Sequence, residues 1–299
     1  RDEGGLLADI FDSESSLLCS WWSVIVIVFA HSPLGLLPHL GNKIWALKSP
    51  NDRSTFIWMA ASFGLTLSLM GIGGFLARAH FGEDLLTGSG NPNQALPLLF
   101  IEIFPSWLAA LIGIGILSAV MSTADGLVIS SSQIIANDLY RKTYIPKRAI
   151  NLSESQIDRN VLNISRLSTI LILILCAFFA QSLINKNVAL IVWIGIGGMM
   201  AAFSGPLILG ALWRGVTKIG AYAGLISGMA TFIVLHAQLI NPIWFINFPY
   251  LHSAANWLVV QGPNPFACTF IGEIVSTFLT YVVSKATRKL PEEHLKKLF

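Results

Sequence analysis

The stretch NVALIVWIGIGGMMAAFSGPLILGALW, residues 187–213, contains no Asp, Glu, Lys or Arg. A run of about 20 apolar residues is long enough to cross the hydrocarbon core of a bilayer as a helix. Comparable charge-free runs lie on both sides of it along the chain: residues 15–42, 54–77, 103–124, 167–185 and 219–272. The sequence therefore has the pattern of a protein that crosses a membrane several times.

The overall composition agrees with that pattern. Hydrophobic residues make up 54% of the 299 residues and charged residues only 12%, whereas a soluble domain carries about 25% charged residues. This excludes a soluble enzyme and a disordered chain, and a net charge of +3 excludes a nucleic-acid-binding module. The three cysteines lie far apart without metal-ligand spacing, so we expect neither a disulfide nor a zinc site.

The apolar runs are expected to be helices, because an unsatisfied backbone group is costly in hydrocarbon. Seven spans are predicted, at residues 16–47, 55–76, 106–139, 165–183, 188–213, 219–239 and 266–283. The predicted fold class is an all-α polytopic membrane protein, with the lipid bilayer as its surroundings.

Seven crossings divide the basic residues unequally between the two sides of the membrane. Of the 19 Lys and Arg residues, sixteen fall in one set of loops and only Arg1, Arg78 and Lys186 in the other. Since basic residues accumulate on the cytoplasmic side, the N-terminus is predicted outside and the C-terminus in the cytoplasm, in the plasma membrane or cell inner membrane. Residues 82–94 and the aromatic stretch 241–265 are then external loops, and residues 95–104 lie along the outer interface.

The third predicted span carries polar side chains at membrane depth. Ser118, Ala119, Ser122 and Asp125 share one helical stripe, with Thr123 beside it. Hydroxyls in such helices often bond back to a carbonyl about four residues earlier and merely assist packing. However, an ionisable group inside a span normally faces a cavity or a partner. Hard oxygen ligands with a single carboxylate would suit a monovalent cation such as sodium.

The first predicted span is interrupted by the stretch FAHSPLGLLPH, residues 29–39. Pro33, Gly35 and Pro38 remove helix hydrogen bonds, which predicts an unwound segment, with a simple packed kink as the alternative. Unwound backbone at membrane depth lines a cavity or is buried in protein. His31 is then either a polar residue of that cavity or a histidine satisfied within the core.

Small residues dominate the fifth and sixth spans, including Gly205-Pro206, and their expected role is close helix packing. Glu273 in the last span faces an interface or a partner that the sequence does not identify, or has a structural role.

These motifs together resemble the sodium/solute symporter family. AVMSTAD at residues 119–125, followed by SSSQIIANDLYRK at 130–142, is similar to the family's most recognisable helix and its Asp-Leu-Tyr-Lys exit. Pro38-His39 with Lys43 resembles the inner half of the family's broken substrate helix. Residues 203–224 resemble its late Gly-Pro, Trp-Arg and Gly-Ala motifs.

The resemblance implies a leucine-transporter-type core of two inverted five-helix repeats, with ion and solute bound at the midplane between broken helices. This chain would be one transmembrane domain, residues 1–299, truncated at its N-terminus and lacking the helices of the first repeat. Residues 1–239 would form the second repeat and the following helix. Residues 240–299 would form an external loop, the last span and a cytoplasmic tail.

The family's sodium site, transferred by position, places a backbone carbonyl on Ala119 and hydroxyls on Ser122 and Thr123, with Asp125 as a possible further ligand. The substrate-facing break falls at residues Ala30, His31, Ser32, Pro33 and Leu34. The implied function is sodium-coupled symport of a small organic solute, such as an amino acid, pantothenate or a carboxylate, by alternating access.

The sequence bears on three other functions. A membrane-embedded enzyme is not expected, because HExxH, GxSG and paired intramembrane aspartates are absent. A channel would need a repeated polar ring along its pore, which one cluster in the third span does not provide. A membrane scaffold or sensor of the same fold that binds solute without moving it stays open as the alternative.

Overall fold

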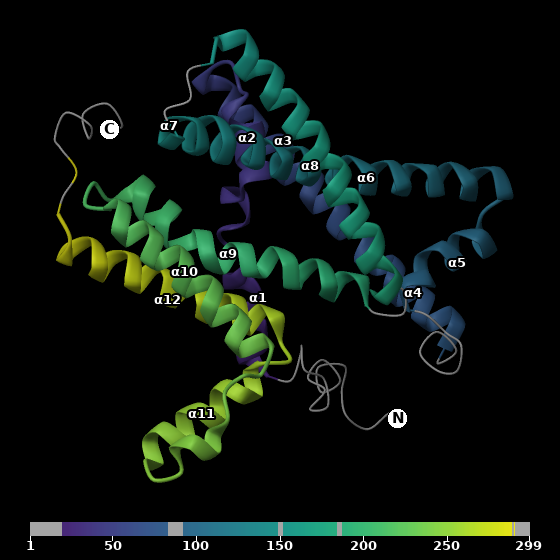
Figure 1. Cartoon of the computed structure of the whole chain (residues 1–299). Helices are drawn as coiled ribbons and strands as arrows, with labels where there is room; N and C mark the ends of the chain where they lie inside the picture. The colour runs from purple at the N-terminus through teal and green to yellow at the C-terminus, as the bar shows by residue number, and fades with distance from the viewer. Residues whose placement is uncertain (1–19, 83–91, 149–151, 184–186, 289, 291–299) are drawn as a thin grey trace. The chain divides into compact units, whose positions relative to one another are not determined.

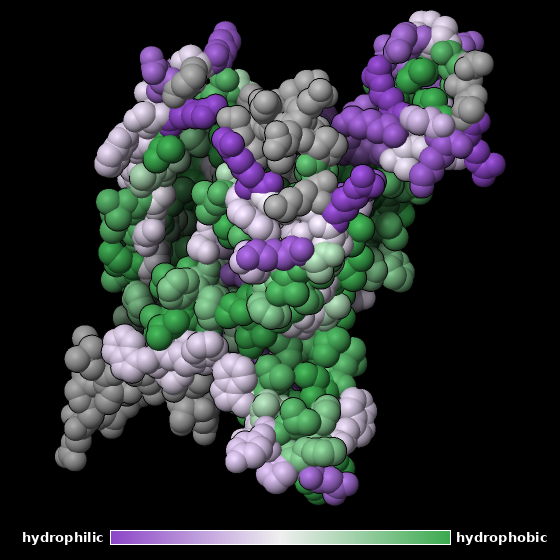
Figure 2. Space-filling model, turned by 90° about the vertical axis from the view of Figure 1, so that its left-hand side faces the viewer, coloured by the Kyte–Doolittle hydropathy of each residue, from purple (hydrophilic) through white to green (hydrophobic). Residues whose placement is uncertain are grey.

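The structure, a computed structural model, describes residues 20–82, 92–148, 152–183, 187–288 and 290, and every element among them is helical (Figure 1). Six helical segments of this part are long and apolar enough to cross a membrane: Asn51–Phe81, Ser106–Arg148, Glu154–Leu183, Val188–Leu212, Lys218–His236 and Pro265–Ala286. Hydrophobic side chains cover wide areas of the face shown in Figure 2, as a lipid-facing surface requires. The chain is therefore an all-α polytopic membrane protein, as predicted.

The chain divides into two compact units. Unit 1 contains residues 1–41 and 189–299, and unit 2 contains residues 42–188. Unit 1 holds α1 (Trp21–Ala30), η1 (Leu34–Leu36), α9 (Val188–Leu212), α10 (Lys218–His236), η5 (Pro242–Phe245), α11 (Pro249–Gln261) and α12 (Pro265–Ala286). Unit 2 holds α3 (Pro50–Ser68), α4 (Met70–Phe81), η3 (Pro92–Gln94), α5 (Ala95–Ile103), α6 (Ser106–Gln133), η4 (Ile134–Tyr144), α7 (Ile145–Arg148) and α8 (Glu154–Leu183). The predicted division at residue 239 into a repeat and accessory parts stays a prediction.

The first predicted span is broken where its prolines lie, which confirms the predicted unwinding. Helix α1 ends at Ala30, the short 3₁₀ helix η1 follows, and α2 (Pro38–Trp45) begins at the second proline. Between the helices, the N–H groups of Ser32, Leu34 and Leu37 each bond to a carbonyl three residues earlier. Prolines cannot donate to a helix, so these tighter bonds replace the regular ladder across the break.

In unit 1, α10 and α12 run side by side in close contact (Figure 1). Glycines make this possible: a Cβ on Gly224 would collide with Oγ1 of Thr280, and one on Gly220 would collide with Oγ of Ser284. Small residues at helix contacts let backbones approach closely in membranes. The glycine-rich motif of residues 217–228 is thus a packing surface, as the sequence indicated.

Helix α9 contacts α12 at its internal proline. Pro206 has no N–H, so the carbonyl of Ala202, four residues earlier, lacks its usual helix donor. The hydroxyl of Ser276 on α12 donates to that carbonyl at 3.1 Å and accepts from the N–H of Gly205 at 3.3 Å. The fully buried Ser276 side chain therefore satisfies a defect in one helix from the neighbouring helix.

The segment predicted as a loop at residues 241–265 is mostly helical, and this corrects the sequence-based expectation. It contains η5 and the thirteen-residue α11. Pro249 at the first turn of α11 fits a helix start because that position needs no N–H. The indole N–H of Trp22 donates to the side chain of Gln261 at 2.8 Å, so the end of α11 is tied to α1.

In unit 2, two helices extend beyond the predicted spans. The helix of the third predicted span continues from α6 through the π-helix η4 to Arg148. The helix of the fourth predicted span starts at Glu154, eleven residues before that span was predicted to begin. Arg141 pairs at 3.1 Å with both Glu154 and Asp158, which joins the two extensions. Hydropathy detects only the apolar part of a helix, so the polar turns were missed.

Some predictions fall on residues outside the described part. The N-terminus, most of the predicted external turn at 82–94 and most of the tail after residue 288 belong there. Residues 95–103 of the predicted interfacial segment form α5, while their position relative to a membrane stays a prediction.

Candidate functional site

The predicted ion ligands lie together on α6 in unit 2. Ala119, Ser122 and Thr123 occupy positions i, i+3 and i+4, so they share one face of this helix. All three are exposed, as is Asp125. Among the described residues, no group of three His, Cys, Asp or Glu side chains is placed to hold a metal ion. That the hydroxyls and carbonyl of α6 bind a monovalent cation stays a prediction.

The hydrogen bonds on α6 are of the kind expected from packing alone. The hydroxyl of Thr123 donates to the carbonyl of Ala119 at 3.3 Å, and that of Ser118 donates to Ile114 at 2.9 Å. Such a bond uses the hydroxyl proton and leaves oxygen lone pairs free. Back-bonding and ion binding are therefore compatible at Thr123. A measurement of function distinguishes a hydroxyl that only back-bonds from one that also binds an ion.

The predicted solute residues at the break of the first span have different surroundings. Ala30 and Pro33 are buried, His31 and Leu34 are half-buried, and Ser32 is exposed. The ring of His31 meets Trp193 edge-on at 4.2 Å between centroids and stacks on Phe266 at 5.7 Å. Its Nδ1 donates to the carbonyl of Ile27, because a carbonyl can only accept.

The histidine is thus held by an aromatic cluster, defined here as His31, Trp193 and Phe266. The ring centroids of Trp193 and Phe266 lie 4.5 Å apart, and the two residues come from the beginnings of α9 and α12. Neither was identified from the sequence as a site residue. A single aromatic inside an apolar run gives no signal of its own, since most such residues simply pack.

The two predicted sets belong to separate units. The break lies in unit 1 and the polar stripe of α6 lies in unit 2. Each set is intact within its unit: the five break residues are consecutive, and the α6 ligands share a face.

Comparisons with known proteins give one family. The model of the Sodium:solute symporter family matches residues 18–228. The chain is 29% identical over 202 residues to a sodium/pantothenate symporter of Haemophilus influenzae, covering 67% of this chain and 39% of that protein. It is 29% identical over 222 residues to a sodium/proline symporter of the same organism, covering 67% of this chain and 41% of that protein.

A sodium/proline symporter of Escherichia coli is 28% identical over 208 residues, covering 66% of this chain and 38% of that protein. The chain thus spans about two fifths of the length of these curated relatives. No solved structure matches. The family match ends within α10, so α11 and α12 lie beyond it.

Proposed function

The chain belongs to the sodium:solute symporter family, and from that premise we propose that the protein containing it couples sodium entry to the uptake of a small organic solute. The family is one of transporters by its description, not of enzymes. The names of these relatives include pantothenate or proline. The proposed solute class is therefore an amino acid, pantothenate or a similar carboxylate.

The observation that carries the proposal is the break between α1 and α2. A spanning segment interrupted by a 3₁₀ turn offers backbone groups and side chains at membrane depth, which is a feature of alternating-access transporters. We assign solute contact to Ala30, His31, Ser32, Pro33 and Leu34. In this proposal the ring of His31 is presented by its aromatic cluster, while the exposed hydroxyl of Ser32 is free to meet solute.

The proposed sodium ligands are the carbonyl of Ala119 and the hydroxyls of Ser122 and Thr123, with Asp125 contributing negative charge nearby. Their exposure on unit 2 supports a shared site, completed by helices that lie in the rest of the protein. Alternating access would then consist of one bundle rocking against the rest. We place the protein in the plasma membrane with the C-terminus in the cytoplasm.

The test is uptake by the complete protein at varied sodium concentration. Ser122→Ala and Thr123→Ala each remove one ligand from a desolvated cation, a loss of about 1–3 kcal/mol. That corresponds to a roughly 5- to 150-fold higher sodium concentration for half-maximal uptake. His31→Ala should instead raise the KM for solute, because it changes the proposed solute site and leaves the ion ligands in place.

Ser118→Ala is the matched control. Ser118 lies on the same helix and makes the same back-bond, but it is not a proposed ligand, so its sodium dependence should equal that of the unmodified protein. Unchanged sodium dependence in both ligand variants would favour packing as the role of these hydroxyls. Binding of solute without any sodium-dependent uptake would identify a scaffold or sensor instead.

A further inference from the structure

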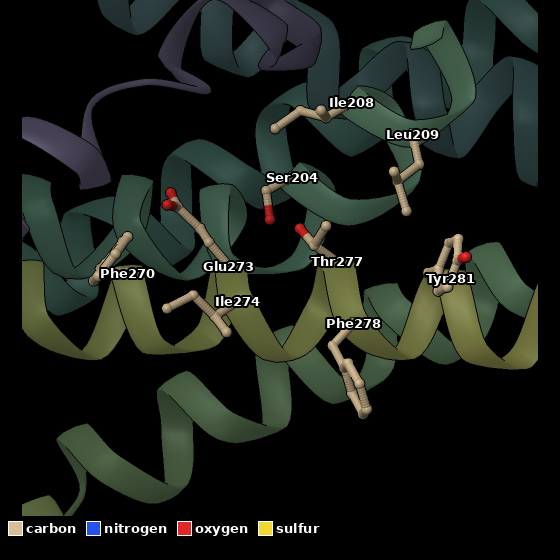
Figure 3. Close-up of a pocket in the computed structure, with 9 residues that line it drawn as sticks. All are labelled: Ser204, Ile208, Leu209, Phe270, Glu273, Ile274, Thr277, Phe278 and Tyr281. Atoms are coloured by element: carbon tan, nitrogen blue, oxygen red, sulfur yellow. The ribbon is translucent and has the colours of Figure 1, made fainter. Parts of the chain in front are cut away.

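A cavity of about 540 Å³ that is wide open on one side lies in unit 1 between α9 and α12. Six apolar or aromatic side chains and three polar ones line it: Ile208, Leu209, Phe270, Ile274, Phe278 and Tyr281, with Ser204, Glu273 and Thr277. Figure 3 shows the side chains of Glu273 and Thr277 extending from α12 and that of Ser204 extending from α9. This volume and apolar lining are typical of a site for a small organic molecule.

Two of the three polar groups of this cavity have an unpaired oxygen atom. Glu273 is only 7% exposed and Ser204 only 1%. Among the described residues, neither Oε1 of Glu273 nor Oγ of Ser204 has a hydrogen-bond partner. Buried polar atoms are nearly always paired, and an ionisable group within a span normally faces a partner or a substrate path. The two unpaired groups therefore call for a ligand.

The frame around these groups is well defined. Ser204 directly precedes Gly205-Pro206, where Ser276 bonds across from α12 to Ala202 and Gly205. Glu273 lies three residues before Ser276 on α12, so it faces the same crossing of the two helices. The distance between the unpaired groups is thus set by a crossing that is itself hydrogen-bonded.

The chemistry of the lining selects the ligand class. A carboxyl group in an apolar surrounding stays ionised only beside a cation and otherwise takes up a proton, and a hydroxyl oxygen accepts a further hydrogen bond. A bare metal ion would find three oxygen-bearing side chains in a space far larger than itself, with apolar walls that cannot complete its shell. An ammonium group on an apolar body meets both requirements, because aromatic rings also attract ammonium groups.

We propose that the cavity between α9 and α12 is a binding site for a small hydrophobic organic ammonium, whose charged group contacts Glu273 and Ser204. No residue of the lining is a proposed sodium ligand or solute contact, although Phe270 also packs against the core cluster that contains Ala30. The proposal does not depend on the proposed function. It includes α12, which lies beyond the residues that the family model matches.

The test measures binding of 2-phenylethylammonium to the complete protein in lipid nanodiscs by calorimetry, with empty nanodiscs as the blank. The neutral 2-phenylethanol and the anionic 3-phenylpropanoate have similar bodies without the positive charge. We expect the ammonium to bind and both analogues to bind at least about tenfold more weakly, which is about 1.4 kcal/mol.

Glu273→Gln keeps the shape of the side chain and removes its charge, so it should weaken ammonium binding at least about tenfold. Ile208→Phe fills the cavity, leaves the carboxyl in place and should weaken binding too, which keeps the test valid if Glu273→Gln does not fold. Glu102→Gln is the control, because this carboxylate is exposed on α5 and pairs with His80 at 2.9 Å; it should bind the ammonium like the unmodified protein.

Several results would overturn the proposal. One is equal binding of the ammonium and the alcohol, and another is unchanged binding in both cavity variants. Sodium binding that depends on Glu273 would identify an ion site instead. Absence of ammonium binding to the unmodified protein would also refute the proposal.

Discussion

Replacing Ser276 by alanine should leave the carbonyl of Ala202 without a donor. Pro206 cannot supply the N–H that this carbonyl would accept in a regular helix. The hydroxyl of Ser276 supplies it at 3.1 Å and also accepts from Gly205 at 3.3 Å. Ser276→Ala therefore removes two hydrogen bonds from a side chain that is 0% exposed.

The expected cost follows from measured hydrogen bonds between membrane helices, which average about 0.6 kcal/mol and reach about 1.7. Because a buried carbonyl is left unsatisfied, we expect a loss of about 1.5 kcal/mol in the free energy of unfolding. The assay is equilibrium unfolding of the purified protein in mixed micelles by SDS titration.

A double-mutant cycle with Pro206→Ala tests whether the missing N–H of Pro206 is the reason for the cost of Ser276→Ala. Alanine at position 206 restores the N–H that can bond to the carbonyl of Ala202, so Ser276→Ala should cost only about 0.5 kcal/mol in that background. The expected coupling is thus about 1 kcal/mol, within the range found for residues in contact.

Ser62→Ala serves as the control for this cycle. The Ser62 hydroxyl donates to the carbonyl of Trp58 at 2.8 Å on an exposed face of α3, where the helix itself also bonds that carbonyl. Loss of the Ser62 hydroxyl should change the free energy of unfolding by less than about 0.5 kcal/mol. If the effects of Pro206→Ala and Ser276→Ala are simply additive, the proline defect is not what Ser276 satisfies.

Two further predictions concern packing and topology. Gly228→Ala would place a Cβ against the carbonyl oxygen of Ala201 on α9, so α10 must move and the free energy of unfolding should fall by about 2 kcal/mol or more in the same SDS assay. Gly64→Ala, whose Cβ would meet nothing within 4 Å, should be neutral or stabilising. Equal effects of the two variants would contradict the close approach of α10 to α9. With native cysteines replaced, an impermeant thiol reagent applied to intact cells should label a cysteine at Ser253 and not one at Lys147, and the reverse result would invert the predicted orientation.

The membrane class and the broken first span could be derived from the sequence alone. Both depend on local chemistry: a charge-free run of sufficient length favours a helix in lipid, and Pro33 and Pro38 remove backbone donors wherever the chain folds. The residues of the candidate ion site could also be placed on one face of a helix, because helical spacing is a local property.

Only the tertiary structure decided which faces of these helices meet. A helix in lipid is apolar all round, so hydropathy does not distinguish a packed face from a lipid-facing one. The bond from Ser276 to Ala202 joins residues 74 positions apart, and the contacts of His31 with Trp193 and Phe266 likewise connect distant parts of the chain. Glu273 was visible in the sequence as an intramembrane carboxyl. That it shares a cavity with Ser204 follows only from the crossing of α9 and α12, because that crossing is set by side chains of both helices together and by neither helix alone.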